Sequence, residues 1–173
     1  ALRFAARHVE HSGYGQAIRL DRELGDDDTD YLRAQLQFEP GSAWSLNLSA
    51  DLTRVRTSSQ LITLVAAGPP ATEIPALEGN PTDDLSRYVS PDPMSVEDNR
   101  AGGFDGRVWG AAGGVTGELA GSTFKSISAY RSLDAASYNT DFDGTPYDLW
   151  AMLRREQDEY QFSQELQAYG QAV

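Results

Sequence analysis

The side chains best suited to metal chemistry stand close to the start of the chain. His8-Val9-Glu10-His11 carries imidazole and carboxylate groups, which are common ligands of divalent metals. On an extended strand His8 and Glu10 share a face while His11 points away, so a joint site requires a bend. We therefore interpret this segment as the solvated end of a strand and predict no metal site.

Two further stretches carry residue types found in known sites. Asp26-Asp27-Asp28-Thr29-Asp30 offers the oxygen ligands that calcium prefers, but it lacks the glycine and distal glutamate of an EF-hand loop. We interpret it as a solvated acidic loop. Ser122-Thr123-Phe124-Lys125 matches the S-x-x-K pattern of penicillin-recognising enzymes, which needs one helical face, whereas residues i and i+3 of a strand point to opposite sides. We predict no catalytic residue, no cofactor and no enzyme activity.

Composition limits the possible partners of the chain. Its 173 residues carry 26 acidic and 14 basic side chains, a net charge of −12, so nucleic acid is not an expected partner. There is no cysteine, which excludes disulfides and thiolate metal sites. No run approaches eighteen apolar residues, so the sequence predicts no transmembrane helix.

The stretch from Tyr31 to Thr57 predicts two β-strands joined by a tight turn at Glu39-Pro40-Gly41-Ser42. Apolar side chains occupy every second position in both arms, and polar ones lie between them. Strict period two gives a sheet with one apolar and one polar face, whereas a helix would spread these positions around its surface. The apolar face consists of Leu32, Ala34, Leu36, Phe38, Trp44, Leu46, Leu48, Ala50 and Leu52.

Two features favour a membrane barrel over a half-buried soluble sheet. Phe38 and Trp44 close the apolar face beside the turn, where a barrel carries an interfacial aromatic girdle. At about 3.3 Å per residue and a tilt near 45°, Trp44 to Leu52 covers roughly 21 Å, close to the ~25 Å apolar band of such barrels. Arg54 and Arg56 keep the parity of Leu52 beyond that length, so we expect them to contact lipopolysaccharide phosphates. These four aromatic and arginine residues are the predicted membrane-interface positions.

Alternating stretches elsewhere predict four more strands, at about 2–10, 104–119, 123–139 and 160–168. The parity of 123–139 is mixed, so its lipid-facing side is left open. Aromatic residues beside the outer loops are interpreted as an outer girdle with loop packing, and a stacking surface for a ligand is the alternative. They are Tyr138, Phe142, Tyr147 and Trp150.

The connections alternate between long and short. Bacterial barrels have long extracellular loops and short periplasmic turns, so His11–Asp28, Thr57–Gly103 and Asp141–Asp158 are predicted to face outside. The turns at Pro40 and Gly121 are predicted to face the periplasm. Six strands are too few to close a barrel, and an open edge in lipid leaves backbone groups unpaired. We therefore expect flanking strands in a longer sequence.

Four segments carry a resemblance to one family. Phe124–Leu133 resembles the strand written "LKSITAYRxL" in TonB-dependent outer-membrane receptors of proteobacteria, and Asp143-Gly144-Thr145-Pro146 looks like the loop that follows. Phe162–Leu166 is similar to the family's "FSQELRL" strand, and Leu48–Arg54 to another strand of the same barrel. Their order and spacing match, and the resemblance covers nearly the whole chain.

The resemblance implies a 22-stranded barrel with an N-terminal plug, in the outer membrane of a Gram-negative bacterium. Such receptors import ferric siderophores, cobalamin or other scarce ligands with energy from the inner-membrane TonB complex. Residues 1–173 would be a partial barrel, with the plug and the TonB-contacting box in sequence not included here. The family's ligand-contacting residues vary with substrate, so none is assigned.

Two other interpretations remain open. In a soluble or secreted β-sandwich, such as a carbohydrate-binding module, the leucines of the central hairpin would lie beneath a second layer. In a barrel wall they stay uncovered within this chain. The leucines concerned are Leu32, Leu36, Leu46, Leu48 and Leu52. A small complete eight-stranded barrel requires two further strands hidden in the long loop.

Overall fold

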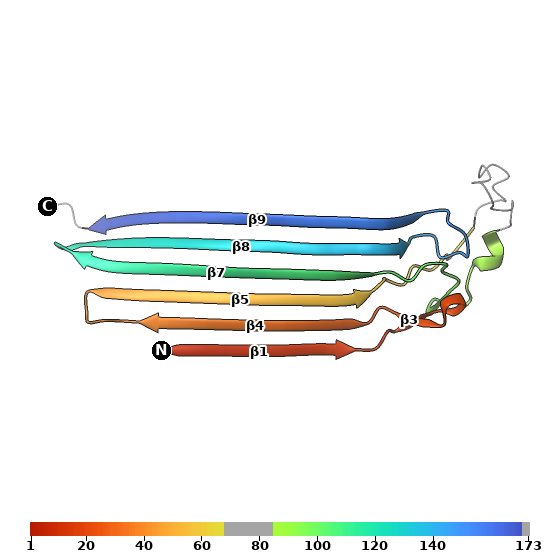
Figure 1. Cartoon of the computed structure of the whole chain (residues 1–173), viewed down its shortest axis with the longest axis horizontal. Coiled ribbons are helices and arrows are strands. Elements are labelled where there is room, and N and C mark those ends of the chain that lie inside the picture. Colours follow the sequence, from red (N-terminus) through yellow and green to blue (C-terminus); the bar gives the residue numbers. More distant parts are fainter. Residues whose placement is uncertain (68–84, 171–173) are drawn as a thin grey trace.

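The protein is all-β, and its long strands form one antiparallel sheet (Figure 1). The computed structural model describes residues 1–67 and 85–170. Six strands pair in the order β1-β4-β5-β7-β8-β9, so each long strand lies beside the next one along the chain. Their bounds are β1 (Leu2–His11), β4 (Asp27–Phe38), β5 (Trp44–Ser58), β7 (Gly103–Leu119), β8 (Ser122–Asp141) and β9 (Ala151–Gly170). The predicted six-stranded meander is confirmed.

The strand register places apolar side chains beside apolar side chains across the sheet. Leu36 pairs with Leu2 on one side and with Leu48 on the other. Side chains of directly paired residues lie on the same face, so each such set forms a row across the sheet. Trp44, on the apolar face of β5, pairs with Gly117 of β7, and Gly117 pairs with Phe124 of β8. The even-numbered residues of β8 therefore lie on the apolar face. The register therefore assigns the one strand whose alternation left its orientation open.

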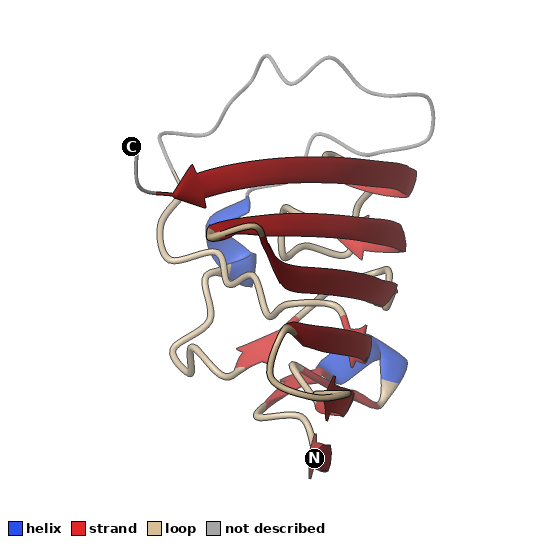
Figure 2. Cartoon of the chain, turned by 90° about the vertical axis from the view of Figure 1, so that its left-hand side faces the viewer, coloured by secondary structure: helices blue, strands red, loops and turns tan. Residues whose placement is uncertain are grey.

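Short turns lie at one end of the sheet and long connections at the other (Figure 1). The β7–β8 turn has positive φ at both Ala120 (51°) and Gly121 (76°), the conformation of a type I′ hairpin. Seen from the short-turn end, the long strands form a single layer (Figure 2). Among the described residues β1 and β9 are the two edges, and the sheet does not close on itself.

The long connections fold into a second, smaller structure, here called the loop cap (residues 12–26, 59–67, 85–102 and 142–150). It contains a three-stranded sheet of order β3-β2-β6, in which β2 and β6 are parallel. Ala17, Leu24 and Val96 form its buried core, with Leu61 and Ala101 packed against them. Its elements are β2 (Gly15–Ala17), η1 (Ile18–Leu20), β3 (Arg22–Leu24), η2 (Leu85–Tyr88) and β6 (Ser95–Val96).

The structure shifts two predicted loop boundaries. Residues 61–65, which follow the central hairpin, lie outside β5, and Leu61 packs in the small core of the loop cap. The connection predicted to end at Asp158 is wrong at that end, because β9 begins at Ala151. Residues 154–159 of β9 all carry charged or amide side chains without alternation, so the sequence predicts a loop there. Likewise β4 begins at Asp27, inside the acidic run, one residue before the predicted end of the loop. Within the predicted connection Thr57–Gly103, residues 68–84 lie outside the described residues.

Within residues 1–67 and 85–170, helical structure is confined to η1 and η2. No helix within the described part of the chain has the length and apolar character needed to cross a membrane.

Candidate membrane-facing surface

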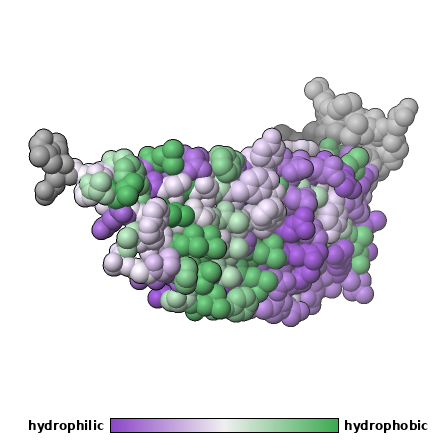
Figure 3. Space-filling model, turned by 60° about the vertical axis from the view of Figure 1, so that its left-hand side comes forward, coloured by the Kyte–Doolittle hydropathy of each residue, from purple (hydrophilic) through white to green (hydrophobic). Residues whose placement is uncertain are grey.

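The apolar face of the long strands forms a continuous band, here called the apolar band. It extends from the row of Trp44 to the row of Leu52 and crosses all the long strands. Hydrophobic atoms gather in the half nearer the short turns and hydrophilic atoms in the half nearer the loop cap (Figure 3). The large apolar side chains of the band are Leu2, Phe4, Leu32, Leu36, Phe38, Trp44, Leu46, Leu48, Leu52, Trp109, Val115, Phe124, Tyr130, Tyr160, Phe162 and Leu166.

The band is open to its surroundings. Leu48, in its middle row, is 43% exposed, and Phe4 is 72% exposed. None of the five hairpin leucines is buried, so no described segment of this chain forms the second layer that a sandwich requires. An uncovered apolar surface of this extent indicates a lipid or protein partner.

Aromatic side chains border the band at both ends. Phe38 and Trp44 lie exposed at the short-turn end, where the sequence predicted them, and the Trp44 ring covers Gly117 of the next strand. At the opposite end the ring centroids of Trp109 and Tyr130 are 5.2 Å apart, and Tyr130 stacks on Tyr160 at 6.5 Å. Sequence reasoning missed this second border because the three residues come from different strands and only the register aligns them.

The aromatic residues predicted for an outer girdle lie further out. Tyr138 pairs with Gly103, well beyond the Leu52 row, and Phe142 and Trp150 belong to the loop cap with centroids 5.4 Å apart. Tyr147 meets Tyr88 edge to face at 5.7 Å. The part of the prediction that concerned loop packing is therefore confirmed for these loop residues.

Charged side chains replace apolar ones immediately beyond the Leu52 row. These charged side chains form two rows across the sheet, here called the charged rows. The first row contains His8, Asp30, Arg54, Arg107, Asp134 and Asp158. The second contains Glu10, Asp28, Arg56, Asp105, Ala136 and Glu156. The change from apolar to ionic occurs at the same level on every long strand, as expected where hydrocarbon gives way to polar head groups.

Arg54 and Arg56 lie in these rows. Their side chains are on the same face as the apolar band, as their parity predicts, and just beyond its Leu52 row. Arg56 Nη2 is 2.8 Å from an Asp28 carboxylate oxygen and 3.1 Å from one of Asp30, and Arg54 Nη2 is 3.5 Å from Asp105. Exposed ion pairs of this kind contribute only about 0–1 kcal/mol, so a phosphate can compete for either arginine. Their contact with lipopolysaccharide stays a prediction.

The pairing of β1 with β4 brings His8 to two carboxylates that sequence reasoning did not connect with it. His8 Nδ1 lies 2.9 Å from Asp30 Oδ1 and 3.9 Å from Asp28 Oδ1, while its Nε2 lies 3.5 Å from Glu10. Potential ligand atoms of His8, Asp28 and Asp30 are within 4.8 Å of one another. Arg56 already supplies a cation to both aspartates, so this is a charge network across the sheet.

The acidic run is not the solvated loop that the sequence suggested. Asp26 accepts a hydrogen bond from the backbone N–H of Ser58 (2.5 Å), and Asp27 accepts one from the Thr29 hydroxyl. Asp28 is bonded to Arg56. These carboxylates have donors because the run starts strand β4 and lies beside the end of β5. The prediction missed this because the donors to Asp26 and Asp28 are 32 and 28 positions away in the sequence.

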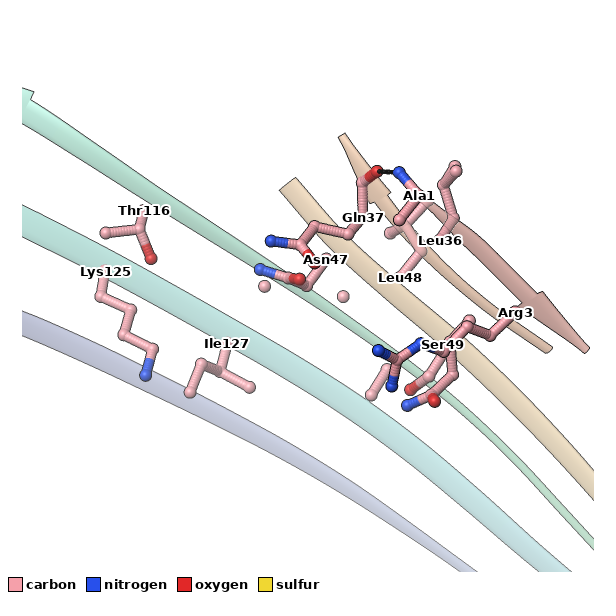
Figure 4. Close-up of a pocket in the computed structure, with 14 residues that line it drawn as sticks. Ala1, Arg3, Leu36, Gln37, Asn47, Leu48, Ser49, Thr116, Lys125 and Ile127 are labelled. Carbon is pink, nitrogen blue, oxygen red and sulfur yellow. Dashed lines mark hydrogen bonds between the residues drawn. The ribbon is translucent and has the colours of Figure 1, made fainter. Parts of the chain in front are cut away.

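The opposite face of the sheet is polar and carries a groove of about 410 Å³. Figure 4 shows its side chains on neighbouring strands, including Arg3, Gln37, Asn47, Thr116 and Lys125. On the same face, further along the strands, the Arg131 guanidinium passes over Gly110 to reach Asp51, with Nη2 at 2.9 Å and 3.0 Å from the two carboxylate oxygens. In a barrel this face would line a wet lumen.

The S-x-x-K match does not make a catalytic pair. Ser122 and Lys125 both lie in β8, where residues of opposite parity point to opposite faces. Lys125 lines the polar groove, and Ser122 lies at the short-turn end. The geometry therefore agrees with the expectation drawn from a strand.

Comparison with known proteins adds no relative to this description. No family model, no curated protein and no solved structure matches the chain.

Proposed function

We propose that this chain forms part of the wall of a transmembrane β-barrel in the outer membrane of a Gram-negative bacterium. The observation that carries the proposal is the uncovered apolar band, bounded by aromatic residues and then by two charged rows at one level on all the long strands. Lipid would cover the band, lipopolysaccharide would meet the charged rows, and short turns would face the periplasm.

Within that class, we assign the chain to the barrel of a TonB-dependent receptor. The support is the set of sequence motifs in order along the chain, three of which lie in β5, β8 and β9 of the meander. The function is import of a ferric siderophore or another scarce, large ligand, driven by the TonB complex through an N-terminal region outside residues 1–173. The chain has no catalytic part in this role.

The architecture suits that role in two respects. The polar face, with its groove and the Asp51–Arg131 pair, would line the lumen beside a plug domain. The loop cap would face outside the cell, where ligand is captured, because the described parts of the long connections lie together at one end of the sheet. The edges at β1 and β9 would pair with flanking strands, since unpaired backbone groups in lipid cost several kcal/mol each.

Fractionation of the full-length protein tests the proposal. Expressed with its natural flanking sequence in a Gram-negative host, it should be recovered in the outer-membrane fraction and migrate differently in unheated and heated gel samples. Uptake of its ligand should stop when the TonB complex is removed. Recovery of folded protein in the soluble fraction would instead support the sandwich-type binding module.

A further inference from the structure

The loop cap buries carboxylates that the membrane-facing surface does not involve. Asp98 is 1% exposed and Asp141 is 2% exposed. Asp98 follows β6, and Asp141 is the last residue of β8, so segments far apart in the sequence bring the two together. Ionised carboxylates are almost never fully buried unless something compensates their charge.

The neighbours of Asp98 have donors of their own. Asp141 accepts hydrogen bonds from the backbone N–H groups of Asn99 (3.3 Å), Asp143 (2.9 Å) and Gly144 (3.3 Å). Asp143 in turn accepts bonds from the backbone N–H groups of Thr145 (3.0 Å) and Trp150 (2.8 Å). These contacts hold two carboxylates in fixed positions beside the segment that carries Asp98.

Asp98 differs from both, because its Oδ1 is buried and has no hydrogen-bond partner. The side-chain oxygen of the next residue, Asn99, is also buried and without a partner. The backbone N–H of Asn99 donates to Asp141, so the segment that carries these two oxygens lies against a buried carboxylate, and the side-chain N–H of Asn99 donates to Asp148 (2.7 Å). A buried acceptor without a donor costs free energy unless another group or ion satisfies it.

The hydrogen bonds of Arg100 go to residues outside this cluster. Arg100, the nearest arginine in sequence, gives its guanidinium to Asp148 (2.7 Å and 2.8 Å) and to Asn139. A cation from outside the protein would supply the partner that Asp98 Oδ1 lacks among the described residues.

We propose that the loop cap binds a calcium ion, with the Asp98 carboxylate and the Asn99 side-chain carbonyl as ligands and Asp141 and Asp143 as flanking negative charge. Oxygen-only donors suit a hard cation, and calcium accepts the irregular six- to eight-fold coordination that backbone carbonyls and water can complete. Zinc is disfavoured because the chain has no cysteine and its two histidines, His8 and His11, belong to β1. The ion would tie β6 to the end of β8 and rigidify the cap.

Terbium luminescence tests this proposal on the purified full-length protein, stripped of metal with EDTA. Trp150 donates its backbone N–H to Asp143 (2.8 Å), so this tryptophan is next to the cluster and serves as the sensitiser of a bound terbium ion. We expect saturable luminescence that CaCl₂ displaces, with a Kd of about 10⁻⁴–10⁻³ M as in extracellular calcium modules, and MgCl₂ should displace it at least tenfold less well.

Matched variants locate the site. Asp98→Asn should weaken calcium binding at least tenfold, whereas Glu97→Gln, which removes the same charge one residue away, should leave it nearly unchanged. Two measurements on the unsubstituted protein need no variant. Calcium should raise the melting temperature of the protein, and it should slow proteolytic cleavage within the loop cap. Absence of saturable calcium binding overturns the proposal, as does equal binding by Asp98→Asn. If Asp98→Asn is more stable and calcium has no effect, a proton rather than a cation neutralises Asp98.

Discussion

Replacing Leu48 with arginine is expected to destabilise the folded full-length protein by about 2–4 kcal/mol. Leu48 occupies the middle row of the apolar band, between Leu36 and Gly113, and would face the centre of the hydrocarbon layer. A charged side chain at that depth costs this amount in outer-membrane barrels because the ion loses its hydration. Denaturant titration of the protein folded into lipid vesicles measures the change.

Ser49→Arg is the matched control for Leu48→Arg. Ser49 is adjacent in β5 but points to the polar face, where it borders the groove and the Asp51–Arg131 pair. An arginine there keeps its water, so we expect a change within about 0.5 kcal/mol. Similar losses of stability for the two variants would contradict the assignment of one face to lipid and the other to a wet lumen.

The second large effect is expected at Gly102, immediately before β7. A Cβ atom at this position would overlap the carbonyl oxygens of Tyr138 and Asn139. The Gly102 N–H also donates a hydrogen bond to the Ser59 hydroxyl, and the Gly102 carbonyl accepts one from the Ser59 N–H, each at 3.0 Å. Gly102→Ala therefore has to displace β8 or break this junction, and we expect a loss of about 1–3 kcal/mol, measured by denaturant titration.

Gly114→Ala, inside β7, provides the comparison. A Cβ atom there meets Ser126 O at 3.8 Å and the Ile127 side chain at 3.9 Å, which are ordinary contacts. Alanine also restricts the unfolded chain more than glycine does, so Gly114→Ala should be neutral or stabilising by up to about 1 kcal/mol. Equal destabilisation by the two alanine variants would show that the Gly102 junction is not as tight as described.

The meander could be predicted because its signal is local. Alternation over a few residues fixes which side chains share a face, and Leu32, Leu36, Leu48 and Leu52 show it without interruption. The turns could be predicted from glycine, which adopts positive φ readily, and both Gly41 and Gly121 do so in the structure. The same alternation predicted Phe38 and Trp44 at one border of the band.

The remaining features depend on register, which no short window of sequence contains. Ser126, Ser128 and Ser132 hid the apolar face of β8 until pairing with β7 placed Phe124 and Tyr130 on it. Pairing across 20 residues or more brings His8 to Asp30. The parallel contact of β2 with β6 joins residues even further apart.

The loop cap was hidden from sequence reasoning for a further reason. Its core consists of three small elements whose side chains have no periodic pattern, and Asp98 stands in a polar, proline-containing stretch that predicts exposure. Its burial follows from the folding of three long connections against one another. Such burial of a carboxylate contradicts what its local sequence predicts, and this conflict is one reason for the calcium site that we propose there.

The central claim is that lipid covers the even-numbered face of β5, and a single-cysteine scan tests it directly. The chain has no native cysteine, so a spin label can be attached at each position from Ser45 to Leu52 in turn. In lipid vesicles, labels at Leu46, Leu48, Ala50 and Leu52 should collide often with oxygen dissolved in lipid and rarely with a water-soluble nickel chelate. Labels at the odd positions should show the reverse. If the even positions are shielded from both reagents, a protein layer covers the leucines and the barrel-wall account is wrong.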